Sequence, residues 1–168
     1  MIFRMVLMVC TAGYGAVTDL KTHKIYNKLT VPVMLSGILL NFFLGGVSGL
    51  KFSLLGILFG FATVIFWFLG MLKAGDIKLY MALGALGGWE VCLSIIVISI
   101  LAGGIAAAGV MLVRKTGKRS LRQIKIYVLN LLYTRCYRVY QPEDERGYFS
   151  FGCCIFAGTV LSTYLFLY

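Results

Sequence analysis

The chain is organised as long apolar runs separated by short polar or basic stretches. The runs cover roughly residues 2–17, 29–44, 50–72, 79–113 and 148–168. Apolar positions are continuous within each run rather than alternating, which favours helices over the strands of a membrane barrel. A helix that crosses a bilayer needs ~20 mostly apolar residues, and it bonds all of its own backbone polar groups. The pattern therefore predicts an all-α protein with about six membrane-spanning helices in one bundle, because the longest run can supply two of them.

That longest run must contain a reversal. Its 35 residues lie between Lys78 and Arg114, and we expect both of these basic residues on the same side of the membrane. At 1.5 Å per residue the run makes about 50 Å of helix, which is enough for two short or tilted spans. We expect the break at Gly87-Gly88, with Trp89 as an interfacial anchor. A short re-entrant helix followed by one steep span is the alternative.

The composition agrees with a membrane protein. Hydrophobic residues make up 60% of the 168 positions, and the mean hydropathy is +0.91, well above the range of soluble globular domains. This length leaves no room for a separate soluble domain, so we predict a single membrane domain over residues 1–168. The net charge of +10 then indicates topology signals and contacts with anionic lipid headgroups, and no nucleic-acid partner is predicted.

Basic residues are divided unevenly between the two sets of connecting segments. Fourteen fall in one set, and only Arg4 and Lys51 fall in the other. The positive-inside rule makes the larger set cytoplasmic and the N-terminus external. Nine of the fourteen lie in residues 114–146, which we predict to be a cytoplasmic or interfacial basic segment before the last helix. Within it, residues 121–139 fit a helix on the inner membrane surface and a solvated loop equally well.

Small residues and cysteines add two weaker indications. Residues of small size recur four apart at Gly56 and Gly60, at Gly84 and Gly88, and at Gly104 and Ala108. Such pairs allow helices to approach closely in lipid. The five cysteines form no CxxC pair, so neither a metal site nor a disulfide framework is predicted, and no cofactor is implied.

Carboxylates are few, and two of them stand out. Three of the six lie together in the basic segment, at Glu143, Asp144 and Glu145, where a solvated cluster is the simplest interpretation. Glu90 follows Trp89 and is expected to be a surface charge. Asp19 and Asp76 remain, one after the first apolar run and one after the third. Two crossings return the chain to its starting side, so both aspartates are expected at the cytoplasmic ends of helices, at similar depth.

Two carboxyl groups that meet at this depth can catalyse hydrolysis. They cannot both ionise cheaply, so they share one proton, and the sequence does not say which residue holds it. The ionised member takes a proton from water as that water attacks a peptide carbonyl, and the protonated member donates to the leaving group. Alternatively, each acid only pairs with a nearby lysine: Asp19 with Lys21 or Lys24, and Asp76 with Lys73 or Lys78. Gly75 is expected to allow a sharp turn beside Asp76 or the close approach of a substrate strand.

Two stretches of the chain resemble motifs of the type IV prepilin peptidases. The segment TDLKTHKIYNKLT, residues 18–30, resembles the family's first motif, in which an aspartate precedes I-P-N. The segment AGDIKLYMALGALGG, residues 74–88, resembles the second motif, GxGD followed by a lysine and a short glycine-bearing helix. Lys73 stands where the family has the first glycine of GxGD, and Tyr26 stands in place of the proline. The last run also lacks the proline-containing stretch that is common there.

The resemblance implies an intramembrane aspartic endopeptidase of the GxGD type. Such an enzyme removes the basic leader of prepilin-like membrane proteins at the cytoplasmic face of a bacterial or archaeal inner membrane. Asp19 and Asp76 would be the catalytic pair, with Gly75, Lys78 and Asn27 as supporting residues. The chain lacks the CxxC-bearing cytosolic segment of the methylating members. It is therefore expected to be the short, peptidase-only form, similar to those of tight-adherence or Flp pilus systems.

Two other functions are compatible with the pattern of residues. Acids within the membrane and glycine-broken helices also occur in small ion-coupled transporters, although the two halves of this chain show no internal repeat. A non-catalytic assembly component of a pilus or secretion system would need no pair of acids at equal depth. The sequence names neither the individual prepilin substrate nor the residues at its cleavage site, and it gives no oligomeric state.

Overall fold

A computed structural model describes residues 2–22, 24–68, 71–113 and 150–167. Every regular element in these ranges is an α-helix, which confirms the predicted all-α class. The chain order is α1 (Ile2–Thr22), α2 (Asn27–Ala62), α3 (Val64–Phe68), α4 (Ala74–Val113) and α6 (Gly152–Leu165). The basic segment 114–146, with its possible surface helix at 121–139, lies outside the described residues.

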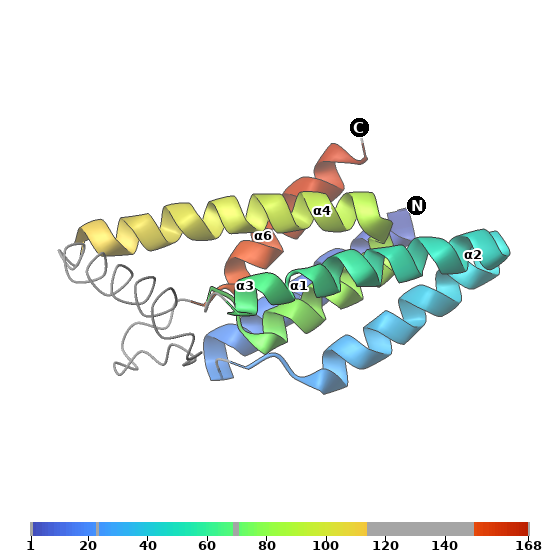
Figure 1. The fold of residues 1–168 in the computed structure, drawn as a ribbon, viewed down its shortest axis with the longest axis horizontal. Coiled ribbons are helices and arrows are strands. Elements are labelled where there is room, and N and C mark those ends of the chain that lie inside the picture. Colours follow the sequence, from blue (N-terminus) through green and yellow to red (C-terminus); the bar gives the residue numbers. More distant parts are fainter. Residues whose placement is uncertain (1, 23, 69–70, 114–149, 168) are drawn as a thin grey trace, which may run out of the picture.

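Helix α2 doubles back on itself at Gly46. The backbone there has φ 56° and ψ −135°, a left-handed conformation that glycine adopts at low cost. The two arms, residues 27–45 and 47–62, return side by side from the right-hand tip of the molecule (Figure 1). Near this tip a Cβ on Gly49 would lie only 1.8 Å from the backbone oxygen of Asn41. Glycines therefore provide both the reversal and the close packing of the arms.

The predicted continuous helix over 50–72 is interrupted. Helix α2 ends at Ala62, and the short helix α3 follows after Thr63. Thr63 donates both its hydroxyl and its backbone N–H to the carbonyl of Gly60, at 2.6 and 3.3 Å. This bond to the third residue back tightens the last turn, which ends the helix.

Helix α4 contains the reversal that was expected near Gly87-Gly88. Gly88 has φ 79° and ψ −176°, and a Cβ there would lie 2.1 Å from the Cζ atom of Phe52. The first arm, residues 74–87, runs beside α2, and the second arm, residues 89–113, runs back in the opposite direction (Figure 1). The predicted break is therefore confirmed, with Trp89 directly after it.

The first arm of α4 forms the centre of the core. Leu79, Tyr80, Leu83 and Leu86 are fully buried against side chains of α1, the second arm of α4 and α6. Glycines bring α2 to the same arm, since a Cβ on Gly56 would lie 1.9 Å from the backbone oxygen of Gly84. The small residues Gly104 and Ala108 were also expected to allow a close approach of helices. At Gly104 no such approach is found, because within the described part of the chain no atom lies within 4 Å of a Cβ built there.

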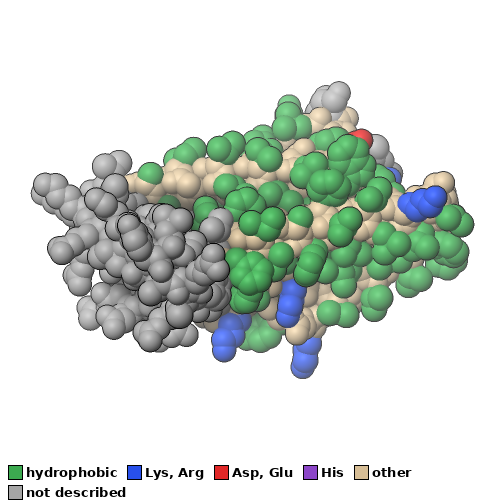
Figure 2. All heavy atoms as spheres, viewed as in Figure 1, with side chains coloured by type: hydrophobic (Ala, Val, Ile, Leu, Met, Phe, Trp, Pro, Cys, Tyr) green, Lys and Arg blue, Asp and Glu red, His purple; other side chains and the backbone are tan. Residues whose placement is uncertain are grey.

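The outside of the assembly is largely apolar. Large side chains such as Phe43 and Ile105 are 80% and 75% exposed, and hydrophobic side chains cover most of the visible face (Figure 2). Lysine and arginine side chains lie toward its lower edge and its right-hand tip (Figure 2). Two stretches, Asn27–Phe68 and Ala74–Gly109, are long and apolar enough to cross a bilayer. An apolar exterior is what a membrane protein presents to lipid.

Candidate active site

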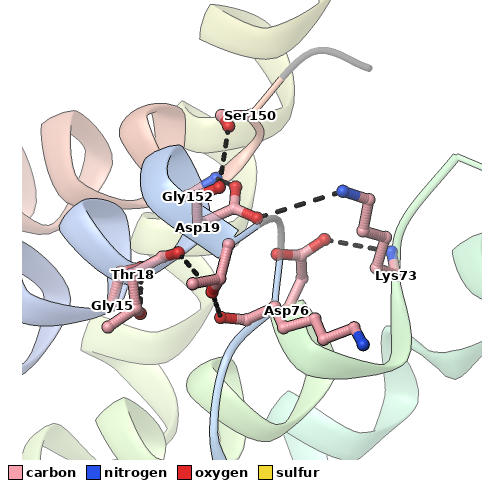
Figure 3. Close-up of polar contacts among 9 residues, drawn as sticks. Gly15, Thr18, Asp19, Lys73, Asp76, Ser150 and Gly152 are labelled. Atoms are coloured by element: carbon pink, nitrogen blue, oxygen red, sulfur yellow. Dashed lines mark hydrogen bonds and ion pairs between the residues drawn. The ribbon is translucent and has the colours of Figure 1, made fainter. Parts of the chain in front are cut away.

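Asp19 lies in the last turn of α1, where its side chain reaches the start of α6. Its Oδ2 atom accepts the backbone N–H of Gly152 at 3.0 Å, and its side chain is 2% exposed. The hydroxyl of Ser150 donates to the backbone oxygen of Asp19 at 3.2 Å (Figure 3). A helix N-terminus carries a partial positive charge, so α6 stabilises a carboxylate that the C-terminal end of α1 would disfavour.

Gly152 is a site residue that sequence reasoning missed. A Cβ at this position would lie 3.0 Å from the Cβ of Asp19 and 3.3 Å from the Cα of Ala16. The first turn of α6 can therefore reach Asp19 closely only because residue 152 has no side chain. A glycine near the start of the last apolar run was the available signal, but nothing in the sequence connects it to a residue more than a hundred positions earlier.

Asp76 is the third residue of α4 and belongs to the first turn of that helix. Its Oδ2 atom accepts the backbone N–H of Lys73 at 3.0 Å, and its own N–H donates to the Lys73 carbonyl at 3.0 Å. This is the geometry of an acid at the third position that caps its own helix. The sharp turn expected at Gly75 is wrong, because Gly75 is helical. A Cβ there would meet the Cβ of Ile25 at 3.1 Å, so the connection between α1 and α2 passes close to this glycine.

The structure brings Asp19 and Asp76 together at one cavity. The cavity has a volume of about 340 Å³ and is lined by Asp19, Lys24, Ile25, Tyr26, Asn27, Lys73, Gly75 and Asp76. The two carboxyl groups point into the same space from α1 and α4 (Figure 3). Both are buried, at 2% exposure each. Of the predicted supporting residues, Gly75 and Asn27 line this cavity.

Lys73 contacts both acids, in a pattern that differs from the simple pairing considered above. Its ammonium group lies 3.9 Å from Oδ1 of Asp19, and its backbone N–H donates to Oδ2 of Asp76 (Figure 3). The ion pair therefore joins a lysine beside the second aspartate to the first aspartate. The side chain of Lys73 is 37% exposed, so its charge is partly solvated as it leans over the cavity.

Lys78 and Asn27 form the next contact outward. The ammonium group of Lys78 donates to Oδ1 of Asn27 at 2.8 Å, in an exposed position. This bond joins the start of α2 to the second turn of α4. Lys78 does not line the carboxylate cavity; it lines a neighbouring groove that also includes Asn27. The residue therefore lies beside the two acids without contacting them.

The arrangement is suited to acid–base chemistry on a bound water. One oxygen of each carboxylate is held by a backbone N–H, which fixes both groups in place. The other oxygen of Asp19 faces Lys73, and within the described ranges Oδ1 of Asp76 accepts no hydrogen bond. A paired and oriented acid and base within reach of one cavity can activate water. Among the described residues, no group of three or more histidine, cysteine or acidic side chains could hold a metal ion.

Comparison with known proteins places this chain in a family. Residues 6–108 match the model of the type IV leader peptidase family. The chain is 29% identical to a prepilin leader peptidase/N-methyltransferase of Aeromonas salmonicida over 131 residues, 65% of this chain and 45% of that protein. Proteins of the same name from Aeromonas hydrophila and Burkholderia pseudomallei are 31% and 32% identical, over 57% and 55% of this chain and 36% and 32% of theirs.

The matched region contains both aspartates and both glycine reversals of the helices. The chain spans less than half the length of these relatives. No solved structure matches it. Because the family model covers more than half of the residues, including Asp19 and Asp76, the chain belongs to the type IV leader peptidase family.

Proposed function

We propose that this chain is an intramembrane aspartic endopeptidase that removes the leader peptide of prepilin-like membrane proteins. The observation that carries the proposal is the meeting of two buried aspartates, 57 positions apart in the sequence, at one cavity. The relatives named prepilin leader peptidases support the substrate class. A transporter or a non-catalytic assembly component would leave both family membership and the paired acids without a role.

In the proposed reaction the two acids act as a unit. The ionised carboxylate removes a proton from water, and the resulting hydroxide forms a bond to the carbonyl carbon of the scissile peptide. The protonated carboxyl donates its proton to the amide nitrogen as the carbon–nitrogen bond breaks, which leaves a carboxyl end and a free amine. The proton taken from water then restores the starting state. The backbone N–H groups of Lys73 and Gly152 hold the carboxylates in position throughout.

The membrane arrangement is part of the proposal. Helix α1, the two arms of α2, the two arms of α4 and α6 would provide six crossings, with the arm 74–87 and α6 as the two shortest. The lysines Lys21, Lys24, Lys28, Lys73 and Lys78 lie on or beside the segments that carry the aspartates. The positive-inside rule then makes this end cytoplasmic, next to anionic headgroups, with the N-terminus outside. A basic leader would reach the acids from the cytoplasmic side.

Substitution of each acid tests the proposal. Asp19→Asn, Asp76→Asn and the double variant should all reduce leader cleavage by at least about a hundredfold, to one common background, because residues that act as a unit are not additive. The assay is co-expression with a prepilin-like substrate and a gel shift for the shortened product. Glu90→Gln is the matched control, since Glu90 is exposed and lies outside the cavity. Normal cleavage by either single variant would overturn the mechanism.

A further inference from the structure

A second hollow lies directly beside the carboxylate cavity. It has a volume of about 420 Å³, within the range of ligand pockets, and is formed between both arms of α2, α3 and the first arm of α4. Its lining is apolar except at one end, and consists of Asn27, Thr30, Val31, Met34, Phe61, Val64, Trp67, Ala74, Ile77, Lys78 and Met81. Asn27 lines both hollows, and the bond between Lys78 and Asn27 marks where they join.

One polar group in this groove has no partner. Thr30 is 3% exposed, and its hydroxyl makes no hydrogen bond within the described part of the chain. Helical threonines usually bond the carbonyl four residues earlier, as Thr11 and Thr159 do here. For Thr30 that carbonyl belongs to Tyr26, and it already accepts the N–H groups of Leu29 and Thr30, at 3.0 and 3.4 Å. The hydroxyl is therefore unsatisfied among the described residues, which is costly for a buried group.

We infer that the groove receives the apolar segment of the substrate that follows the scissile bond, and that the Thr30 hydroxyl donates to a backbone carbonyl of that segment. The inference rests on the proposed function. A membrane segment must be extended where it is cut, and unwound backbone in an apolar setting needs a hydrogen-bond partner. Thr30 supplies one, three residues from Asn27 at the border of the carboxylate cavity.

The shape and chemistry of the groove favour a peptide over a lipid. Val31 and Phe61, at 44% and 51% exposure, lie on the apolar outer surface, so a segment in the bilayer can enter sideways. A lipid acyl chain would fill the apolar part, but the acceptor oxygens of a lipid lie only at its ester and headgroup end, whereas a peptide carries a carbonyl at every residue. A peptide offers both apolar side chains and carbonyl oxygens. We therefore expect the groove to bind a peptide segment that passes from the lipid to the two acids.

Photo-crosslinking in the cleavage-defective Asp76→Asn background tests the location without relying on turnover. A photoreactive residue at position 34, inside the groove, should form an adduct with a co-expressed prepilin-like protein in membranes. The same residue at position 39 should not, because Leu39 is exposed on the same arm of α2 and lies outside the groove. Equal adducts at both positions, or adducts with lipid alone at position 34, would overturn the inference.

Thr30→Val tests the hydroxyl, because it keeps the shape of the side chain and removes the donor. We expect KM for the prepilin-like substrate to rise about fivefold, with kcat within twofold, and Thr30→Ser to restore the wild-type value. Ser162→Ala is the matched control: Ser162 is the other buried hydroxyl without a partner in the described ranges, and it lies on α6 away from the groove. An unchanged KM in Thr30→Val would overturn the role of the hydroxyl.

The two proposals fail in different ways. If the wild-type protein cleaves no prepilin-like substrate, the proposed function is wrong whatever the groove holds. If the wild type cleaves and position 34 forms no specific adduct, the groove inference is wrong and the catalytic pair stands.

Discussion

The two ends of the helical assembly both contain buried polar groups, but they are built differently. At the end away from the aspartates, Arg4 donates to Asn41 at 2.6 Å, and Asn41 donates to Ser53 and to the carbonyl of Ala85, at 2.8 and 2.9 Å. Each of these contacts joins two helices or two arms, and the cavity beside Arg4 has a volume of about 170 Å³. This end has the form of a structural polar network.

The aspartate end contains larger cavities and a buried hydroxyl that has no hydrogen-bond partner among the described residues. Its two hollows have volumes of about 340 and 420 Å³, and the Thr30 hydroxyl has no partner among the described residues. Buried polar groups are normally satisfied, so exceptions need an explanation. Ser162 is a second such hydroxyl, and it lies one turn before Phe166, which lines the cavity beside Arg4. The two ends therefore differ in the size of their cavities more than in unsatisfied hydroxyls. We infer that polar groups at the Arg4 end hold the helices together, whereas those at the aspartate end surround a binding site. Changes at the first end should therefore lower stability, and changes at the second should lower activity.

The largest effect after loss of the aspartates themselves is expected at Gly152. A valine there would place a Cβ 3.0 Å from the Cβ of Asp19, so α6 and Asp19 must separate. A displacement of about 1 Å at a reacting group can cost a hundredfold in rate, and we expect a loss of that size in leader cleavage. Gly104→Val is the control, because no described atom lies within 4 Å of a Cβ at that position. Equal activity of the two variants would show that the contact from α6 does not position Asp19.

A substitution at the Arg4 end should have the opposite effect: it should lower stability and leave cleavage per folded molecule nearly unchanged. Asn41→Leu keeps the approximate size of the side chain but leaves Arg4 and Ser53 without a shared partner. We expect the free energy of unfolding to fall by about 2 kcal/mol, measured by thermal or denaturant unfolding in detergent. Cleavage per folded molecule should stay within twofold. Leu39→Ala, at an exposed position on the same arm, should change neither quantity. A selective loss of cleavage in Asn41→Leu would end the distinction between the two ends.

Much of this arrangement follows from patterns that are local in the sequence. Continuous apolar runs predicted helices, and a glycine pair followed by tryptophan predicted the reversal at Gly88, because both signals act within a few residues. Counting crossings predicted that Asp19 and Asp76 lie at the same end, and both line one cavity.

Contacts between segments far apart in the chain could not be predicted in the same way. The bond from Gly152 to Asp19 depends on where α6 begins, and the ion pair from Lys73 to Asp19 depends on how α1 and α4 pack. The role of Gly75 could not be predicted for the same reason. Its missing side chain suggested a turn, but Gly75 lies in a regular helix, where the absence of a side chain allows Ile25 to approach. Residue type limits what a position can do, and tertiary packing decides which of those uses occurs.

A smaller effect is expected at Lys73, which stands where the resembled motif has glycine. Lys73→Met removes the ammonium group from Oδ1 of Asp19 and leaves the backbone bond to Asp76 in place. Since the side chain is partly solvated, the pair contributes up to about 1 kcal/mol, and we expect up to about fivefold slower cleavage. Lys73→Arg should retain most of the activity. A loss as large as that of Asp19→Asn would mean that the ammonium group takes part in the reaction itself.

The smallest effect is expected at Lys78, which is exposed and contacts neither acid. Lys78→Ala removes only the bond to Asn27 at 2.8 Å, and an exposed bond of this kind contributes a few tenths of a kcal/mol. Cleavage should therefore fall by no more than about threefold, with KM rather than kcat changed, because Lys78 and Asn27 lie at the border of the groove. Asn27→Ala should give the same change, and the double variant should be no worse than either single one. Additive losses would show that the two residues act separately, and a fall in kcat would extend the reacting centre beyond the two aspartates.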